Sequence, residues 1–187
     1  MRRSGIQTHR PARTWAGTDA KVVRHVHVCG VGQLATATRI ELVRLGIHRD
    51  SDCQLPSLHP PLVIACGDSE ADESFDEGAA HAFDIGSPLL LACLSGRLVR
   101  IGPLIQPPDD GLAGPIQAAQ YLHPAGIAEA EVEPGLSLYA RLGALLVAAQ
   151  AMNFLLGTRH PGVLNQVVEL NPWSMESRSY KVLKVRQ

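Results

Sequence analysis

The feature that most restricts the fold is the stretch VHVCGVGQLATATRIELVRLG at residues 26–46. It opens with β-branched residues, which favour a strand, and continues through two closely spaced glycines. Apolar residues then recur with the spacing of one broad helix face, and Gly46 is placed to end that helix. The apolar positions are Leu34, Ala37, Ile40, Leu42 and Leu45. A strand, a glycine turn and a helix in this order predict the start of a Rossmann-like fold.

The glycine turn matches a nucleotide-binding pattern. Gly30, Gly32 and Ala35 fit G-x-G-x-x-[G/A] between a strand and a helix. The first glycine makes the turn, the second lets a phosphate approach the backbone, and the third small residue lets helix and strand pack closely. An acid about 20 positions further on would hold a ribose hydroxyl, and Asp50 and Asp52 fall there. These residues form a candidate cofactor site.

The segment after this helix favours a different interpretation. Residues 47–61, IHRDSDCQLPSLHPP, are polar and rich in proline where a doubly wound fold would place another strand and helix. An acid that does not end a strand would not be held against a ribose. We therefore expect a shortened fold, in which the glycine turn can be retained for packing alone.

The remaining pattern completes an α/β domain. PLVIACGDS at residues 61–69 is typical of a strand covered on both faces, and Asp68 or Ser69 can cap the helix that follows. Residues 88–105 read as two strands joined at Ser95-Gly96, residues 136–156 as a helix, and the last 25 or so residues as two antiparallel strands. The prediction is a Rossmann-like three-layer fold whose sheet starts parallel and gains antiparallel strands at its C-terminal end. Residues 1–20 are expected to be a flexible basic tail before a single truncated domain at 21–187.

Composition excludes several functional classes. The 187 residues carry a net charge of -1, which gives no field for gathering nucleic acid. The four cysteines form no C-x-x-C pair, so we expect buried reduced thiols and no zinc. The first residues supply no apolar core for a secretory signal, so a cytoplasmic location is expected. Gln150 and Asn153 interrupt the apolar helix, which predicts a core or subunit-interface helix and no membrane contact.

Catalytic signatures are missing from the sequence. There is no G-x-S-x-G elbow, and no Walker lysine follows the glycines. A dinucleotide-binding oxidoreductase or sensor would rest on the glycine turn alone, because we find no catalytic acid or base arranged for hydride transfer.

Several stretches taken together resemble the ubiquitin-activating-enzyme-like superfamily. They are HVHVCGVGQLATATRIELVRLGI, PLVIACGDSEAD, GSPLLLACLSGRLVRIGPLIQPP, LYARLGALLVAAQAMNFLLG and VLNQVVELNP. The closer likeness is to its branch of cyclodehydratase components for thiazole/oxazole-modified microcins. The resemblance extends from about residue 22 to the C-terminus, and GRLVRIGPLIQPP is its most telling segment.

The departures from that family concern its chemistry. Adenylating members hold ATP phosphates with an arginine and a lysine, but no lysine occurs here between Lys21 and Lys181. Asp68 matches the family's later aspartate, which the resemblance implies would face magnesium and the triphosphate. Family members commonly bind zinc through C-x-x-C pairs, and no cysteine follows Cys93. The resemblance therefore implies a degenerate member that is not catalytically active alone and binds no cofactor.

The leading hypothesis is an accessory or scaffold subunit in the modification of a ribosomally made peptide. It would form a homodimer and dock a YcaO-type enzyme, which carries the ATP chemistry, or the precursor peptide. The first alternative is an ATP- and magnesium-dependent adenylating enzyme that uses Gly30, Gly32, Asp50 or Asp52, and Asp68. The second is the dinucleotide-binding oxidoreductase or sensor.

Overall fold

A single mixed sheet of six strands forms the centre of the protein in a computed structural model, which describes residues 26–47, 62–69, 72–106, 136–157 and 162–181. The strands lie in the order β1-β2-β3-β4-β5-β6. The first three run parallel and the rest are added antiparallel, which confirms the predicted fold class. Their bounds are β1 Val26–Cys29, β2 Leu62–Gly67, β3 Leu89–Ser95, β4 Leu98–Ile105, β5 Gln166–Asn171 and β6 Glu176–Lys181.

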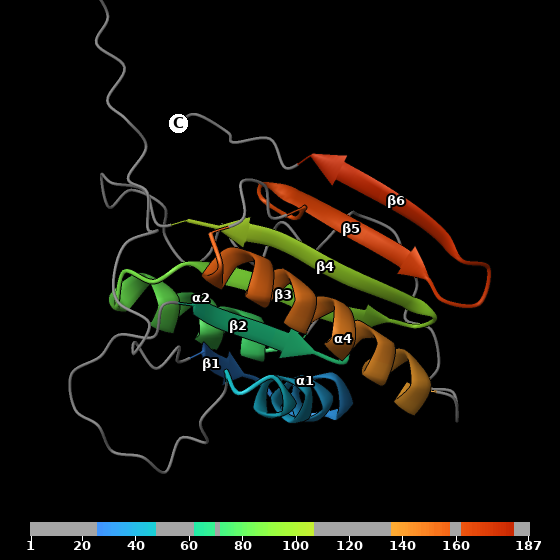
Figure 1. The fold of residues 1–187 in the computed structure, drawn as a ribbon, viewed down its shortest axis with the longest axis horizontal. Coiled ribbons are helices and arrows are strands. Elements are labelled where there is room, and N and C mark those ends of the chain that lie inside the picture. The colour runs from blue at the N-terminus through green and yellow to red at the C-terminus, as the bar shows by residue number, and fades with distance from the viewer. Residues whose placement is uncertain (1–25, 48–61, 70–71, 107–135, 158–161, 182–187) are drawn as a thin grey trace, which may run out of the picture.

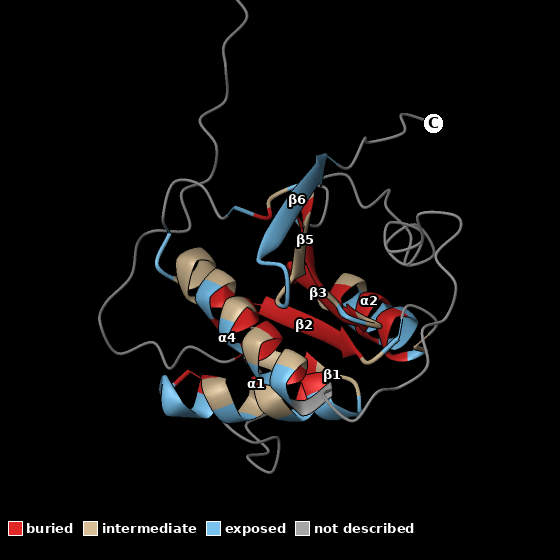
Figure 2. Ribbon diagram, turned by 90° about the vertical axis from the view of Figure 1, so that its right-hand side faces the viewer, coloured by how far each residue is buried: buried red, intermediate tan, exposed pale blue. Residues whose placement is uncertain are grey.

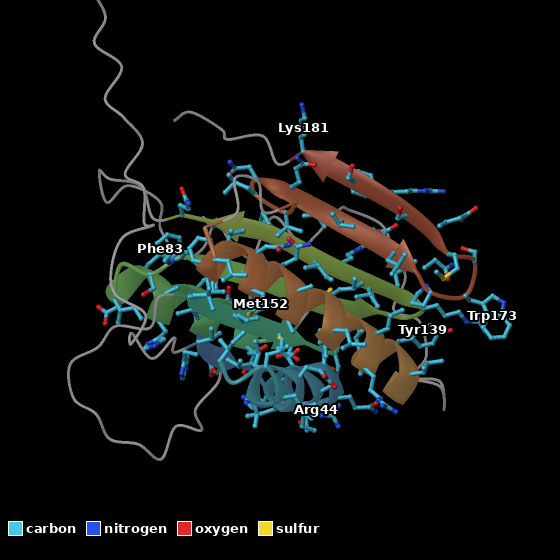
Figure 3. All side chains as sticks on the ribbon, in the orientation of Figure 1. Arg44, Phe83, Tyr139, Met152, Trp173 and Lys181 are labelled. Carbon is cyan, nitrogen blue, oxygen red and sulfur yellow. The ribbon has the colours of Figure 1, made fainter. Side chains whose placement is uncertain are left out.

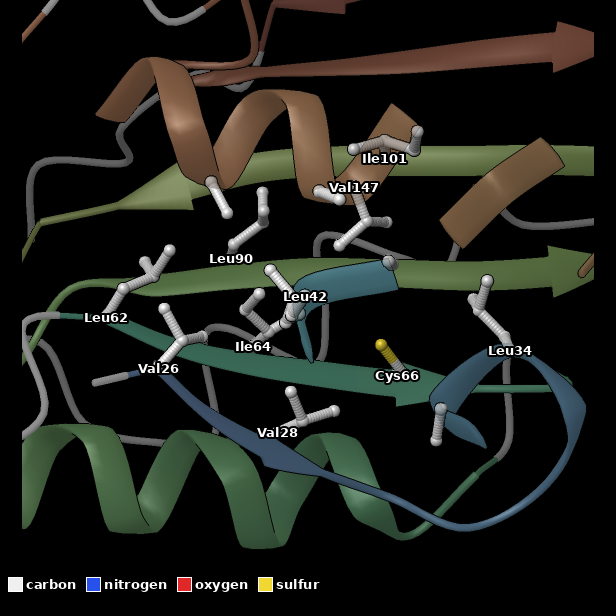
Figure 4. Close-up of a cluster of buried hydrophobic side chains, with 14 of the residues drawn as sticks. Val26, Val28, Leu34, Leu42, Leu62, Ile64, Cys66, Leu90, Ile101 and Val147 are labelled. Carbon is white, nitrogen blue, oxygen red and sulfur yellow. The ribbon is translucent and has the colours of Figure 1, made fainter. Parts of the chain in front are cut away.

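Helices cover both faces of this sheet. Helices α1 (Gln33–Arg44) and α4 (Leu136–Leu155) pack side by side on one face, and α2 (Ser74–Asp84) packs against the other (Figures 1 and 2). The larger hydrophobic core lies between the sheet and the α1–α4 pair (Figure 4). A smaller core lies under α2 around Phe75 and Ala79. Every residue of β2 is buried, as predicted for a strand covered on both faces.

The glycine after α1 ends the helix as expected, but the apolar face of α1 differs from the prediction. Gly46 adopts a φ of 70°, and the N–H of Ile47 donates to the carbonyl of Leu42. Ile40 and Leu45 are exposed, because the sheet and α4 cover a narrower stripe of the helix. The buried residues of α1 are Leu34, Ala35, Thr38 and Leu42.

The way the helices change faces fits the predicted shortening. Strands β1, β2 and β3 follow one another across the sheet without a reversal, yet α1 and α2 lie on opposite faces. Two right-handed crossovers in the same direction would place both helices on one face, and doubly wound folds change face only where strand order reverses. The predicted shortening of the fold after α1 stays a prediction. Residues 48–61, which contain Asp50 and Asp52, lie outside the described residues.

Two antiparallel hairpins form the other half of the sheet. The β3–β4 hairpin turns at Gly96 and Arg97, one residue later than predicted, since Ser95 pairs with Leu98 and Gly96 adopts a φ of 57°. Strands β5 and β6 pair antiparallel as predicted. β5 pairs with β4, and Glu169 accepts a hydrogen bond from the buried Arg100 at 2.9 Å. All six residues of β6 are exposed (Figure 2).

Helix α4 is apolar on more sides than the fold covers. By length and composition, Leu138–Leu155 meets the criteria for a membrane span, with 39% of that window buried. It nevertheless packs against α1, β3 and β4, as the core helix of a globular domain does. The residues it buries are Ala140, Gly143, Ala144, Val147, Ala148 and Ala151. The prediction of a core helix therefore holds for one face of α4, and the opposite apolar face lies in solvent.

Candidate functional site

The glycine turn lies at the carboxyl end of β1, where the predicted cofactor site should be. Gly30 and Gly32 adopt φ angles of 112° and 101°, which side chains other than hydrogen rarely permit. A Cβ at Gly30 would lie 2.0 Å from the carbonyl oxygen of Cys66, and one at Gly32 would lie 2.5 Å from Oδ2 of Asp68. Ala35 is fully buried between α1 and the sheet. Each small residue of the motif is thus required by contacts within the chain.

Asp68 closes the N-terminus of α1. It follows β2, and its carboxylate accepts hydrogen bonds from the backbone N–H groups of Gln33 at 2.6 Å and Leu34 at 2.9 Å. Helix α1 has no side-chain cap of its own, because Gly32 stands at the N-cap position. The suggestion that Asp68 caps the next helix is wrong. It caps the preceding one, because parallel strands bring the end of β2 beside the start of α1.

The start of α2 is tied to the same place. The hydroxyl of Ser74 donates to the carbonyl oxygen of Cys66 at 2.9 Å, and the backbone N–H of Ser74 donates to Oδ1 of Asp72 at 3.0 Å. The Cys66 carbonyl is the atom that faces Gly30. The ends of β1 and β2 and the first turns of both helices therefore form one connected unit.

Arg39 is a residue of this unit that sequence reasoning missed. Its Nη2 donates to the carbonyl oxygens of Val28 at 2.9 Å and Gly30 at 2.7 Å. Carbonyls two residues apart on a strand point to the same edge. Among the described strands β1 is one of the two edge strands, so Arg39 satisfies backbone acceptors that a neighbouring strand would otherwise use. No sequence motif could reveal this role, because its partners are backbone atoms.

Other predicted groups are not brought to the turn. Asp50 and Asp52 lie outside the described residues, so the ribose-binding acid is not placed. His27 packs against His81 of α2, with ring centroids 4.8 Å apart. Within the described ranges, no three His, Cys, Asp or Glu side chains are grouped as a metal site. The arrangement satisfies two N–H groups at the N-terminus of α1 with one carboxylate.

The thiols near the turn are held protonated. Burial raises the pKa of Cys29 to about 11 and that of Cys66 to about 12, although Arg39 acts in the opposite direction on both. Cys29, Cys66 and Cys93 are free thiols, as predicted, while Cys53 lies outside the described residues. Because the thiolate is the nucleophilic form, Cys29 and Cys66 are poor nucleophiles at neutral pH.

These pKa values predict a loss of stability in alkali. Unfolded thiols ionise near the ordinary value of 9.0, whereas Cys29 and Cys66 keep their protons to about 11 and 12. Above pH 9 the unfolded state therefore binds fewer protons, and the free energy of unfolding should fall as pH rises toward 11. Urea denaturation between pH 8 and 11 measures this slope. A Cys66→Ala variant should show a smaller slope than the native chain, and an equal slope would contradict the assignment.

Comparison with known proteins places the fold. No family model matches the sequence, and no curated protein matches it. Among solved structures, E. coli MccB, solved together with MccA, aligns with a TM-score of 0.58 at 12% identity, over 88% of this chain and 66% of that one. MccB has also been solved with ATP, at a TM-score of 0.56 and 11% identity over 85% of this chain and 64% of that one.

Heterocyclases align with the same elements. One solved with substrate and cofactor gives a TM-score of 0.53 at 14% identity over 86% of this chain and 24% of that chain. The heterocyclase TruD aligns with a TM-score of 0.51 at 17% identity, over 84% of this chain and 25% of the TruD chain. This chain has a fold related to MccB and the heterocyclases. It spans about two thirds of the MccB chain and about a quarter of the heterocyclase chains.

Proposed function

We propose that this chain is an accessory or scaffold subunit in the biosynthesis of a ribosomally made, post-translationally modified peptide of the azoline type. It would dock a YcaO-type enzyme or the precursor peptide in the cytoplasm, without ATP or zinc of its own. Support comes from the fold, which is related to MccB and to heterocyclases. The sequence resemblance to cyclodehydratase components points to the same group of pathways.

The position of Asp68 carries the scaffold part of this proposal. In nucleotide-binding turns, the N–H groups at the helix N-terminus receive a phosphate. Here the N–H groups of Gln33 and Leu34 already donate to the Asp68 carboxylate. A phosphate at the same place would have to displace that carboxylate or lie against its negative charge. The turn is therefore complete as a structural element without a nucleotide.

An adenylating enzyme is the second candidate, favoured by the backbone geometry of the turn and by the existence of MccB bound to ATP. Its mechanism would be attack of a carboxylate on the α-phosphate with help from magnesium. The Asp68 contact and the missing lysine argue against it. Titration calorimetry with ATP and magnesium separates the two. Heat of binding at micromolar nucleotide would support the enzyme, and its absence at millimolar nucleotide would support the scaffold.

The outer face of α4 supports assembly into a homodimer. Its solvent side presents Leu138 and Leu145, which are 66% and 53% exposed, and Leu156, directly after its end, is 51% exposed. A helix that is apolar on all sides is normally covered on all sides, and exposed apolar patches mark interaction sites. We propose that a second copy of the chain covers this face. On the neighbouring helix α1, Ile40 is also exposed.

Leu145→Glu is expected to convert the dimer to a monomer. The side chain lies on the outer face of α4, so the substitution places a charge in the proposed interface and leaves the core intact. Light scattering after size exclusion, at micromolar protein, measures the change in mass. Val31→Glu makes the same kind of change at an exposed apolar residue of the glycine turn and should leave the mass unchanged. A native chain that is monomeric at this concentration would contradict the homodimer.

Capture of the partner tests the function itself. The tagged chain is mixed with any YcaO-type enzyme and precursor peptide found in its gene neighbourhood, and the bound fraction is analysed. Retention of either one, together with faster azoline formation when the chain is added, is the expected result. Failure to retain either would overturn the proposal. NAD or FAD absorbance in the purified protein would instead favour the oxidoreductase or sensor.

A further inference from the structure

Strand β6 presents an open backbone edge. Within the described part of the chain it pairs with β5 alone, and all six of its residues are exposed (Figure 2). The hydrogen-bonding groups on its outer edge can be satisfied by water or by another extended strand. A regular, fully exposed edge of this length is a template for strand addition.

The side chains of β6 give this edge a positive charge. Arg178 lies opposite Glu169 in the β5–β6 register, but the Glu169 carboxylate is already paired with the buried Arg100 at 2.9 Å. Lys181 lies opposite the neutral Gln166 and extends away from the sheet (Figure 3). Within the described residues neither Arg178 nor Lys181 forms an ion pair. Arg178 and Lys181 lie three residues apart, so their side chains project from opposite faces of the strand. One cation therefore borders the open edge on each face, and the one acid, Glu176 at the strand's start, shares the face of Arg178.

The turn that leads into β6 holds an aromatic side chain in solvent. Oδ1 of Asn171 accepts hydrogen bonds from the backbone N–H groups of Trp173 at 3.0 Å and Ser174 at 3.3 Å. This Asx turn orders the tip, where Trp173 is 83% exposed and Met175 is 75% exposed (Figure 3). Tryptophan is among the residues that contribute most to protein interfaces, and the ordered turn lowers the entropic cost of using it.

We propose that β6 binds an acidic polypeptide segment in extended conformation, which adds to the sheet as a further strand. The unpaired edge requires a partner with backbone N–H and C=O groups, which nucleic acids and small anions lack. Arg178 on one face of the strand and Lys181 on the other select carboxylates on that partner, and Trp173 covers an apolar residue at its end. A second copy of this chain fits less well, because it would bring two more basic side chains to the same edge.

Binding of a defined probe tests this inference. The probe is a fluorescein-labelled peptide of about ten residues in which pairs of glutamates alternate with pairs of valines, so that both faces of the added strand carry carboxylates; its length suits one strand. Its fluorescence anisotropy should rise on titration with the full-length protein, and a lysine–valine peptide should bind at least about tenfold more weakly. Two further peptides carry N-methyl groups, one at the odd-numbered and one at the even-numbered residues. Both keep the charge of the probe, and each loses the backbone N–H donors along one of its two edges. At least one of them should also lose about tenfold in affinity.

Matched variants assign the binding to β6. Arg178→Glu should weaken the acidic peptide at least about tenfold, whereas Arg44→Glu, the same charge change on the exposed face of α1, should have little effect. Circular dichroism verifies that both variants are folded. No binding at millimolar peptide, equal binding of both N-methylated peptides and the parent, or equal loss in both variants would overturn the inference. It does not rest on the proposed function, since the probe is not a precursor peptide and the partner capture can succeed or fail independently.

Discussion

Gly30→Ala should destabilise the protein by at least about 3 kcal/mol, more than any other single change at the glycine turn. The residue has a φ of 112°, and its new Cβ would lie 2.0 Å from the carbonyl oxygen of Cys66. That oxygen cannot move freely, because it ends a buried strand and accepts the Ser74 hydroxyl. Urea denaturation followed by circular dichroism measures the change in the free energy of unfolding.

Gly46→Ala is the matched control for this prediction. Gly46 also has a positive φ, at 70°, but a Cβ there would meet nothing within 4 Å. Its replacement should cost about 1 kcal/mol through backbone conformation alone. The difference between the two variants isolates the collision with the Cys66 carbonyl. Equal costs at Gly30 and Gly46 would show that the turn is looser than the structure indicates.

Asp68→Ala should cost about 2 kcal/mol, because it removes the side-chain cap that Asp68 provides for α1 and two hydrogen bonds to a charged acceptor. The variant also leaves the N–H groups of Gln33 and Leu34 without their acceptor. Sulfate should therefore stabilise the variant more than it stabilises the native chain at the same ionic strength. Paired urea titrations in sulfate and in chloride measure this difference.

Two comparisons show whether Asp68 acts as the cap of α1. Asp76→Ala removes an acid from the first turn of α2 and should cost less than about 1 kcal/mol. Gly32→Ala should be less damaging in the Asp68→Ala background, since its Cβ would otherwise lie 2.5 Å from Oδ2 of Asp68. An equal stability cost for Asp68→Ala and Asp76→Ala would contradict the role of Asp68 as a cap. Additive costs for Gly32→Ala and Asp68→Ala would show that the close contact between Gly32 and Asp68 has no energetic role.

The scaffold interpretation and the adenylating interpretation differ in the role that they give to the carboxylate of Asp68. The carboxylate of Asp68 is a ligand for magnesium in the second and the partner of a helix N-terminus in the first. The hydrogen bonds to Gln33 and Leu34 support the structural role. Arg39 supports it further, since it fills backbone acceptors of Val28 and Gly30 at the edge where a longer sheet would continue.

Local pattern was sufficient to predict most of the elements. The alternating and continuous apolar runs located the strands. The glycine turn at Gly30 and Gly32 marked the start of α1, and Gly46 marked its end. The apolar face of α1 was predicted less well, because Ile40 and Leu45 have the correct helical spacing and still lie in solvent. Which part of a broad apolar stripe is buried depends on the width of the neighbouring helix and sheet, which the sequence of α1 does not contain.

The sequence by itself therefore determined the fold class, the glycine turn and the expectation of a shortened domain. Those properties follow from local spacing, from backbone conformations open only to glycine, and from the number of residues between elements. The tertiary structure alone decided the role of Asp68, the edge position of β1 with Arg39 across it, and the exposed edge of β6. The first two depend on contacts between segments distant in sequence, which meet where parallel strands bring their ends together. The third depends on the position of β6 at the end of the described sheet, where it pairs with β5 alone.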